Sequence, residues 1–552
     1  MHTTRYAPNG MVSSVDHLAS SAGVTALERG GSAADAAIAA NAVLAVTAPH
    51  MCGLGGDLFA LIHDGSGSVG PGQAGAVNAL SVNPGQTGAV DPGKAGALDP
   101  GKAGAVSALN ASGRAGSGAD PDRLRAEGHR RMPHQHDIRS VPVPGCVDGW
   151  LALHARHGRL PLADLLEPAI RLARDGFPAS PLMLAGARVA SQSPGSGDFA
   201  TVRRAGDRVS RPGVARTLEA IAASGREGFY GGEFGAGLLE VGGGEYAESD
   251  LSSPLADWVE PLKMRAFGHD VWSVPPNSQG YLLLMSLGIV EGLSLPVSPG
   301  HAAWAHLLAE AARIAGHDRL DVLHESAKDL LTSGEIARRR SLIDPAAPLS
   351  VRAPSADGDT TYLCAVDGDG MGVSLIQSNA AGFGSLLFEP RTGINLHNRG
   401  IGFSLTPGHP AEYAPGRRPP HTLAPALITR PDGSLRSVVG TMGGDAQPQI
   451  LLQVITRLLR YGETPGQAVS APRWRLSPGD TGFDTWAAPA DPVIDLEEGA
   501  TWADGLSALG HEVSARPYGS LFGHAHVIDV RPDGMLAGAA DPRSLIGAAL
   551  GR

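Results

Sequence analysis

The sequence DTTYLCAVD, residues 359–367, follows the polar loop SADGD and has the composition of a β-strand. The turn GDG, residues 368–370, leads into MGVSLIQS, residues 371–378, which is a second strand-forming run. Two such runs joined by a short Gly/Asp turn predict an antiparallel hairpin. In this hairpin we expect Thr360 at the open end, with Ser378 returning beside it.

A glycine pair in a later segment gives this hairpin a chemical context. A threonine at the start of a strand is ordinarily a β-branched residue in its preferred place. However, VVGTMGGDAQPQ, residues 438–449, leads into an apolar run with helical spacing that Gly462 can cap. Gly443 and Gly444 therefore lie between a strand and the start of a helix, where unpaired backbone N–H groups can face an anion.

These two segments, together with motifs in the first half of the chain, resemble the γ-glutamyltransferase family of N-terminal-nucleophile hydrolases. The resemblance implies an α+β fold, a four-layer αββα sandwich in which two antiparallel sheets lie between helical layers. The motifs that carry it are, in order, GMVSS (10–14), GGSAADAA (30–37), GLGGDLF (53–59), TT (360–361), GG (443–444) and ADPR (540–543).

Members of this family cut themselves into two subunits, and the bond that the resemblance implies here joins Asp359 to Thr360. Residues 1–359 would form the large subunit and residues 360–552 the small subunit, which begins with the nucleophile. Together they would make one structural domain. The new α-amino group of Thr360 would serve as the base, because such a group has a pKa of about 7.7–8.0 and can accept the hydroxyl proton.

The resemblance also implies the catalytic residues. Thr360 would attack a γ-glutamyl amide such as glutathione, and the resulting acyl-threonine would pass its acyl group to water or to an amine. The N–H groups of Gly443 and Gly444 would stabilise the oxyanion. Ser378 stands where the family usually has a threonine that hydrogen-bonds the nucleophile. No cofactor is implied.

The implied substrate-binding residues depart from the family pattern. Arg114 stands where the family has the arginine that grips a substrate carboxylate, a task that suits a planar bidentate donor. Arg399 replaces a polar amide residue, and Gly402 replaces the aspartate that holds the glutamyl α-amine. His421 and Thr422 replace two serines that touch the α-carboxylate. Loss of the acidic anchor removes a contact of about 1.5–3 kcal/mol, which favours an alternative: an amidase or acylase on non-glutamyl amides, similar to the cephalosporin acylases of this family.

Composition limits the partners. With 552 residues, of which 42% are hydrophobic, the chain can bury a large core. A net charge of −11 argues against nucleic acid or an anionic membrane as a partner. A small-molecule amide and the two subunits of one precursor are the partners that remain. The three cysteines do not make a disulfide framework, and we expect buried free thiols.

Residues of about 70–106 form an insertion that the family lacks. Three tandem octads, NPGQTGAV, DPGKAGAL and DPGKAGAV, follow a looser copy and cannot bury a core, so we interpret the insertion as an expanded surface hairpin loop. If the insertion disturbs the fold, a further alternative is an unprocessed, non-catalytic binding protein. The first eight residues lack the apolar segment of a signal peptide, and we expect a cytoplasmic protein, although many relatives are exported.

Helical patterns occur near residues 148–157, 162–174, 301–314 and 320–331. Seven histidines lie in or near these patterns and in the segment before them, but none has the spacing of a zinc motif, so we predict no metal site. They are His129, His134, His136, His301, His306, His317 and His324. The GLGG run at residues 53–56 lacks the third glycine of a dinucleotide-binding loop.

Overall fold

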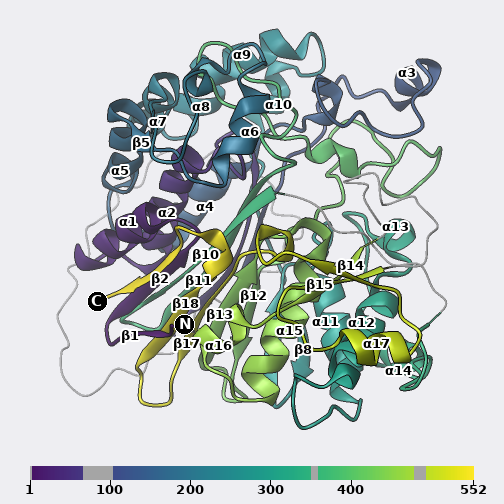
Figure 1. Cartoon of the computed structure of the whole chain (residues 1–552). Coiled ribbons are helices and arrows are strands. Elements are labelled where there is room, and N and C mark those ends of the chain that lie inside the picture. The colour runs from purple at the N-terminus through teal and green to yellow at the C-terminus, as the bar shows by residue number, and fades with distance from the viewer. Residues whose placement is uncertain (1–2, 66–103, 350–358, 478–492) are drawn as a thin grey trace, which may run out of the picture.

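The computed structural model describes residues 3–65, 104–349, 359–477 and 493–552 (Figure 1). Two seven-stranded sheets make its centre, and every pair of neighbours within them is antiparallel. Sheet I has the order β19 (Ala548–Gly551), β2 (Gly10–Ser14), β10 (Asp359–Asp367), β11 (Met371–Ala380), β3 (Asp57–Asp64), β4 (Val106–Ala111) and β7 (Asp257–Val259). Sheet II has the order β1 (Arg5–Ala7), β18 (Leu536–Ala540), β17 (Ala525–Val530), β13 (Leu435–Thr441), β12 (Ala426–Thr429), β9 (His269–Ser273) and β8 (Leu262–Ala266).

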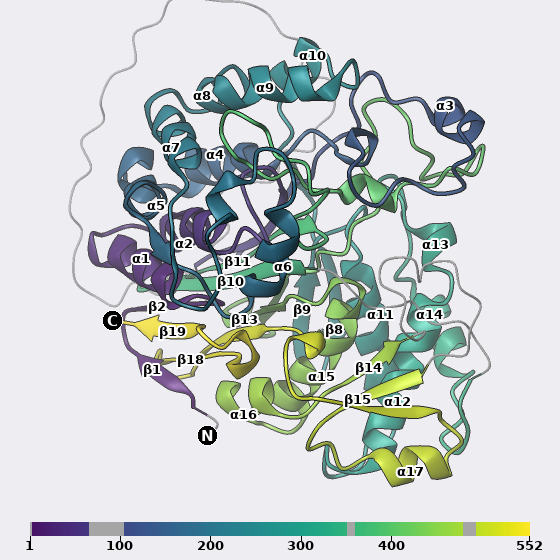
Figure 2. The same ribbon diagram turned by 45° about the horizontal axis from the view of Figure 1, so that its top comes forward.

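Helices cover the outer face of each sheet, as Figures 1 and 2 show. Sheet I is covered by α1 (His17–Glu28), α2 (Ala33–Thr47) and α4 (Cys146–His157), with α5 (Leu162–Asp175) and α7 (Pro212–Ser224) outside them. Sheet II is covered by α11 (Gly280–Glu291), α15 (Gln447–Arg460) and α16 (Pro465–Ser470), with α12 (Ala302–Gly316) packed outside α11 and α15. The predicted αββα sandwich of the α+β class is therefore confirmed.

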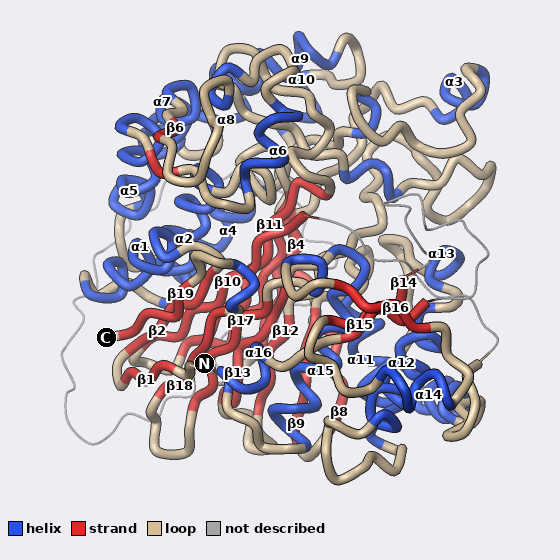
Figure 3. The backbone as a smooth tube through the Cα atoms, in the orientation of Figure 1, coloured by secondary structure: helices blue, strands red, loops and turns tan. Residues whose placement is uncertain are grey.

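Shorter elements complete the described chain. Outside the sandwich lie α3 (Pro121–Ala126), α6 (Met183–Ala190), α8 (Glu227–Tyr230), α9 (Glu233–Gly242), α10 (Glu248–Ser252), α13 (Arg319–Val322), α14 (Ser333–Arg340) and α17 (Ala503–Ala508). A small sheet joins β14 (Trp474–Ser477), β15 (Val493–Glu497) and β16 (Val513–Arg516), and a two-stranded one joins β5 (Phe177–Pro178) and β6 (Arg208–Val209). Figure 3 shows how the strands gather in the middle of the molecule.

The alanine-rich composition of helix α2 suits its position between other helices and sheet I. All of its residues are buried, because it lies between α1, α5 and strands β10 and β11. Small side chains allow this close approach on every face. Ser32 caps the helix in a capping box with Asp35.

The hairpin of β10 and β11 lies at the centre of sheet I. Thr360 pairs with Ser378, which confirms the predicted register, and Asp367 closes the turn by accepting hydrogen bonds from the N–H groups of Asp369 and Met371. The hairpin pairs with β2 on one side and β3 on the other. Strands from before and after residue 360 thus pair with one another at three places in sheet I, so neither part builds this sheet alone.

A tight contact between the two sheets fixes the position of the hairpin over sheet II. The ring of Tyr362 packs against Gly440 so closely that a Cβ at position 440 would lie 2.1 Å from a ring carbon. Tyr362 is two residues from Thr360, and Gly440 is three residues from Gly443. The start of β10 and the end of β13 are therefore neighbours in space.

Several other predictions can be compared with the fold. Helices α4, α5, α12 and α15 confirm the helical patterns, and Cys52, Cys146 and Cys364 are buried free thiols. The predicted helix at residues 320–331 is wrong beyond Val322. The side chain of Leu323 packs in an apolar cluster with Tyr281 and Leu282, and the chain leaves the helix there. The polar residues that follow Leu323 provide no apolar face on which the helix could continue.

The octads lie outside the described residues. The insertion joins β3 to β4, which are neighbours in sheet I, and it is therefore the connection of a hairpin. In the described ranges, none of the helices combines the length and the apolar character needed to cross a bilayer.

Candidate active site

The hydroxyl groups of Thr360 and Ser378 meet at the open end of the central hairpin. Both residues are buried, and Thr360 Oγ1 donates a hydrogen bond of 3.1 Å to Ser378 Oγ. Ser378 Oγ also accepts from the Ala380 N–H at 2.8 Å and from the Arg399 guanidinium at 3.2 Å. The register of the hairpin shifts between residues 359 and 360, a bulge of the kind that re-aims side chains beside active sites.

The glycine pair occupies the turn between β13 and α15. Gly443 and Gly444 have φ angles of 134° and 52°, which belong to the region that favours glycine. The Gln279 side chain holds this turn, because its Nε2 donates to the Gly444 carbonyl oxygen at 2.9 Å and to the Thr422 carbonyl oxygen at 2.7 Å. The peptide that follows Gly444 is therefore fixed in orientation.

Hydrogen bonds connect the hydroxyl pair to this turn. Arg399 lies in a short 3₁₀ helix, Arg399–Gly402, and donates from Nη2 to Ser378 Oγ and from Nη1 to Thr422 Oγ1 at 3.1 Å. Gln279 then connects residue 422 to Gly444. The structure thus brings Thr360, Ser378, Arg399, Thr422 and Gly444 into one hydrogen-bonded site.

A pocket with a volume of about 350 Å³ opens beside Arg399 and Thr422. Its lining carries four arginines and two histidines but a single acidic residue, so its charge suits an anionic ligand. The charged and titratable lining residues are Arg130, Arg131, His134, Arg319, Asp321, Arg399 and His409. Gly402 lines the same pocket.

Arg399 is the buried charge nearest the hydroxyl pair. Burial lowers the pKa of its guanidinium to about 10, although the carboxylates of Asp57 and Asp445 act in the opposite direction. Neither carboxylate forms an ion pair with Arg399, and the Arg399 Nε is buried without a hydrogen-bond partner. Arg319, by contrast, pairs with Asp445 at 3.4 Å and donates to Gln279.

His421 lies behind the site and not in the lining of the pocket. Its Nε2 lies 3.0 Å from Asp57 Oδ2, and its Nδ1 accepts from the Leu423 N–H. Burial and the neighbouring Arg399 lower the pKa of His421 to about 3, so the ring is neutral and donates to Asp57. Asp57 also accepts from the Gly113 N–H. The structure gives His421 a supporting position, and its contact with substrate stays a prediction.

Arg114 also lies outside the lining of the pocket. Its guanidinium faces Asp257 and Glu325, both at 3.4 Å, and donates to the Gly416 carbonyl oxygen at 2.9 Å. One third of its side chain is exposed. The predicted role of Arg114 in holding a carboxylate stays a prediction.

Sequence reasoning missed three residues that hold the site together: Gln279, Arg319 and Asp57. Gln279 belongs to VPPNSQG, residues 274–280, a loop that leads into α11 and in which no spacing marks the glutamine as functional. Asp57 lies within the GLGGDLF motif, so its aspartate could have been singled out. Arg319 gave no signal, because an arginine after a helix is usually a surface charge.

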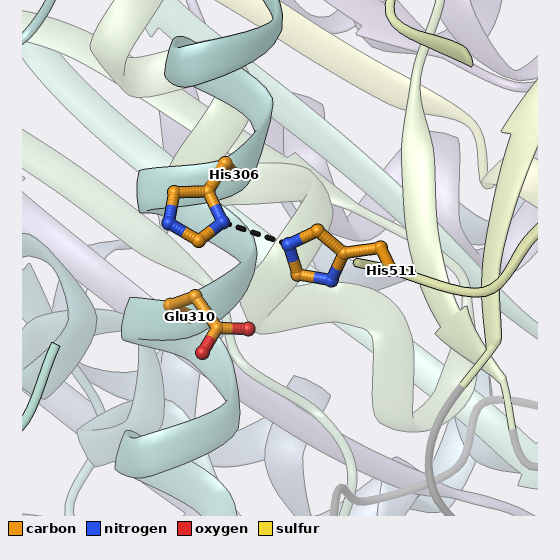
Figure 4. Close-up of side chains that lie close together, drawn as sticks. All are labelled: His306, Glu310 and His511. Atoms are coloured by element: carbon orange, nitrogen blue, oxygen red, sulfur yellow. Dashed lines mark hydrogen bonds between the residues drawn. The ribbon is translucent and has the colours of Figure 1, made fainter. Parts of the chain in front are cut away.

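One cluster outside the pocket has the geometry of a metal site, and Figure 4 shows it. His306 Nδ1 and His511 Nε2 lie 2.7 Å apart, with Glu310 beside them. The remaining ligand atoms of His306 and Glu310 are already used: His306 Nε2 faces the Asp344 carbonyl oxygen, and the Glu310 carboxylate accepts from Arg313 and from the Leu349 N–H. A hydrogen-bonded pair of histidines accounts for this cluster without an ion.

An αββα sandwich with a buried threonine at the second position of a central strand fits the class of N-terminal-nucleophile hydrolases. Comparisons with known proteins agree. The family model of γ-glutamyltranspeptidase matches residues 19–77 and 98–550. The chain belongs to this family.

Similar proteins within the family differ in the activities they are named for. The chain is 34% identical to the glutathione hydrolase-like YwrD proenzyme of Bacillus subtilis, over 98% of both chains. It is 33% identical to the oxamate amidohydrolase proenzyme of Klebsiella pneumoniae, over 99% of both. Among solved structures, the cephalosporin acylase from Bacillus halodurans superposes with a TM-score of 0.84 at 30% identity, covering 100% of this chain and 97% of that one.

Proposed function

We propose that this protein is a self-processing amidohydrolase whose nucleophile is Thr360. In the first step the Thr360 hydroxyl attacks the Asp359 carbonyl, the peptide C–N bond breaks, and the resulting ester is hydrolysed. Thr360 then has a free α-amino group, which takes the hydroxyl proton when Oγ1 attacks a substrate amide. The amine leaves with a proton, and water or a second amine takes the acyl group from the threonine ester.

The observation that carries this proposal is the hydrogen bond between Thr360 Oγ1 and Ser378 Oγ. Thr360 Oγ1 is the donor in this bond, so Ser378 Oγ can orient the hydroxyl of the nucleophile. The Arg399 guanidinium, which donates to the same Ser378 oxygen, supplies a positive charge near the group that becomes negative during attack. The N–H groups beside Gly443 and Gly444 are the proposed oxyanion donors, each of which would contribute about 2.7–4 kcal/mol to lowering the barrier.

Between the two acyl groups that the sequence leaves open, the geometry favours one without an α-ammonium. Gly402 places no carboxylate in the pocket, and the arginines there attract a negative charge. The names of the Klebsiella and Bacillus halodurans relatives, an oxamate amidohydrolase and a cephalosporin acylase, support the same choice. γ-Glutamyl amides such as glutathione are the second candidate, because the Bacillus subtilis relative is named glutathione hydrolase-like.

Intact-mass measurement of the purified protein and of Thr360→Ala tests the proposal. The wild-type protein should consist of two chains that separate between residues 359 and 360, whereas Thr360→Ala should remain one chain. Thr361→Ala is the matched control and should still split. A wild-type protein that stays unbroken and inert toward amides would favour the non-catalytic binding protein instead.

A further inference from the structure

Arg399 is a buried cation without a carboxylate partner in the described part of the chain. Its side chain is 2% exposed, yet its hydrogen bonds go only to the hydroxyl groups of Ser378 and Thr422. A buried charge is costly unless it is paired, so such an arrangement favours a ligand that brings the opposite charge.

The guanidinium has donors left for that ligand. Arginine carries five N–H donors in one plane. In Arg399, Nη1 donates one hydrogen bond to Thr422 and Nη2 donates one to Ser378. The Nε–H is buried and unpartnered, and the residue lines the pocket. A carboxylate is the group whose two oxygens match adjacent N–H donors of this kind.

The distance from Arg399 to the nucleophile limits the length of the ligand. Thr360 Oγ1 and Arg399 Nη2 bind the same oxygen, Ser378 Oγ, at 3.1 and 3.2 Å, so at most two hydrogen-bond lengths separate them. A carboxylate bound to Arg399 stands about 2.8 Å from the guanidinium, and an attacked carbonyl carbon stands about 3–3.5 Å from Oγ1. When both ligand groups lie on the same side of Ser378, the carboxylate and the scissile carbonyl are separated by about the distance between the two protein atoms, which is roughly 6 Å or less. This separation suits an acyl group of up to about five carbons.

We propose that Arg399 binds the free carboxylate of a short dicarboxylic acid monoamide and so places the amide carbonyl over Thr360 Oγ1. This inference rests on the proposed function and names its substrate class. The reaction converts one monoamide and one water into the dicarboxylate and the amine: the C–N bond breaks, the acyl group passes through the Thr360 ester, and the amine leaves protonated. Acyl groups of up to about five carbons fit this separation, whereas a longer acyl group has to fold back.

Matched chromogenic amides test this inference. Succinyl 4-nitroanilide and butyryl 4-nitroanilide have the same chain length and the same leaving group and differ in the terminal carboxylate. We expect processed wild-type protein to prefer the succinyl compound by about 10- to 100-fold in kcat/KM, since a charge-assisted contact has that effect. The glutaryl compound should also be cleaved well, and the γ-glutamyl compound, which has the same chain length but carries an α-ammonium, should be poorer than the glutaryl one.

Substitutions show which of the two predicted substrate-binding arginines, Arg399 or Arg114, recognises the carboxylate. In Arg399→Gln the succinyl-to-butyryl ratio should fall to near one, and dividing the two rates cancels any effect on Ser378 that both substrates share. Arg114→Gln should keep the wild-type ratio, as should Arg216→Gln, which removes a surface guanidinium paired with Glu233. If Arg399→Gln does not process, inhibition of the wild-type protein by succinate against butyrate supplies the same comparison.

The outcomes distinguish the inference from the function on which it rests. Equal rates for succinyl and butyryl compounds, a strict requirement for the γ-glutamyl group, or loss of the ratio in Arg114→Gln alone would overturn the role of Arg399 and leave the amidohydrolase in place. A processed protein that cleaves none of the anilides would overturn both.

Discussion

Gly402 touches the backbone of Pro420 so closely that position 402 has no room for a side chain. A Cβ built there would lie 2.4 Å from the Pro420 carbonyl oxygen. An aspartate, which resemblance to the family would place at this position, therefore cannot be added by substitution alone, because the Pro420 backbone would have to move. The pocket is closed to the acidic anchor that a glutamyl α-ammonium needs.

We expect Gly402→Asp to lose stability without gaining γ-glutamyl activity. Overpacking against backbone costs about 1–3 kcal/mol, so the urea midpoint should fall, as it should for Gly402→Ala. Gly334→Ala is the matched control, because a Cβ at position 334 meets nothing within 4 Å. A stable Gly402→Asp enzyme that cleaves γ-glutamyl 4-nitroanilide faster than wild type would show that the pocket accepts the anchor after all.

Ser378→Ala should slow both self-cleavage and amide hydrolysis. The substitution removes the oxygen that joins Thr360 to Arg399, and we expect rates to fall by about 10- to 100-fold, the size of one charge-assisted hydrogen bond. Ser378→Thr keeps the hydroxyl and should retain most activity. Rates are read from the time course of chain splitting and from kcat.

Ser374→Ala is the matched control for this prediction. Ser374 lies on the same strand, is buried, and bonds the Tyr362 hydroxyl at 2.9 Å. Removal of the Ser374 hydroxyl should lower the free energy of unfolding without slowing self-cleavage or amide hydrolysis. Equal slowing in both variants would mean that Ser378 acts through packing of β11.

The features that the sequence predicted well are local. The hairpin register follows from two runs and a turn, and α15 follows from apolar spacing that ends before Gly462. The family motifs extended this to the sandwich and the glycine turn. Each of these predictions depends on neighbours along the chain or on a known pattern.

The assembly around Arg399 could not be predicted in this way. It needs Gln279, Arg399 and Thr422 from three separate segments, and their contacts form only when the two sheets pack. The spacing of residues along one sequence does not show which arginine side chain has no carboxylate partner in the folded protein. The same limit explains why Arg114 and Arg399 could not be ranked before the ion pairs of Arg114 were seen.

Gln279→Glu should reduce kcat while leaving KM little changed. Gln279 Nε2 donates to the carbonyl oxygens of Thr422 and Gly444, and a carboxylate would repel both. The glycine turn would then lose its orientation, and a misdirected oxyanion donor typically costs about 10²-fold or more in kcat. Steady-state kinetics with a chromogenic amide measure the effect.

The control for this prediction is Gln453→Glu, because Gln453 has the same bonding pattern elsewhere. Its Nε2 donates to the carbonyl oxygens of Gln449 and Trp474, and it is equally buried. Both variants should lose stability, but only Gln279→Glu should lose kcat. A parallel loss of kcat in both would assign the effect to general destabilisation.

The histidine pair of Figure 4 should make stability depend on pH. Burial, with His306 and Arg313 nearby, lowers the pKa of His511 to about 4, whereas an unfolded histidine titrates near 6.5. As pH falls from 6.5 toward 4, the unfolded chain therefore binds a proton that the folded one does not, and stability is lost by up to about 1.4 kcal/mol per pH unit. Above pH 6.5, His511 makes its full contribution to the free energy of unfolding.

Urea unfolding of wild type and His511→Gln at pH 7.5, 6.0 and 5.0 checks this prediction. The variant should be less stable at pH 7.5, because it loses the 2.7 Å bond to His306, but its stability should fall less steeply with acid. His17→Gln, which changes an exposed histidine, should follow the wild-type slope. Since hydrogen bonds account for the ligand atoms of His306 and Glu310, EDTA should leave the unfolding midpoint unchanged. A midpoint that falls with EDTA and recovers with Zn²⁺ would instead reveal a metal centre.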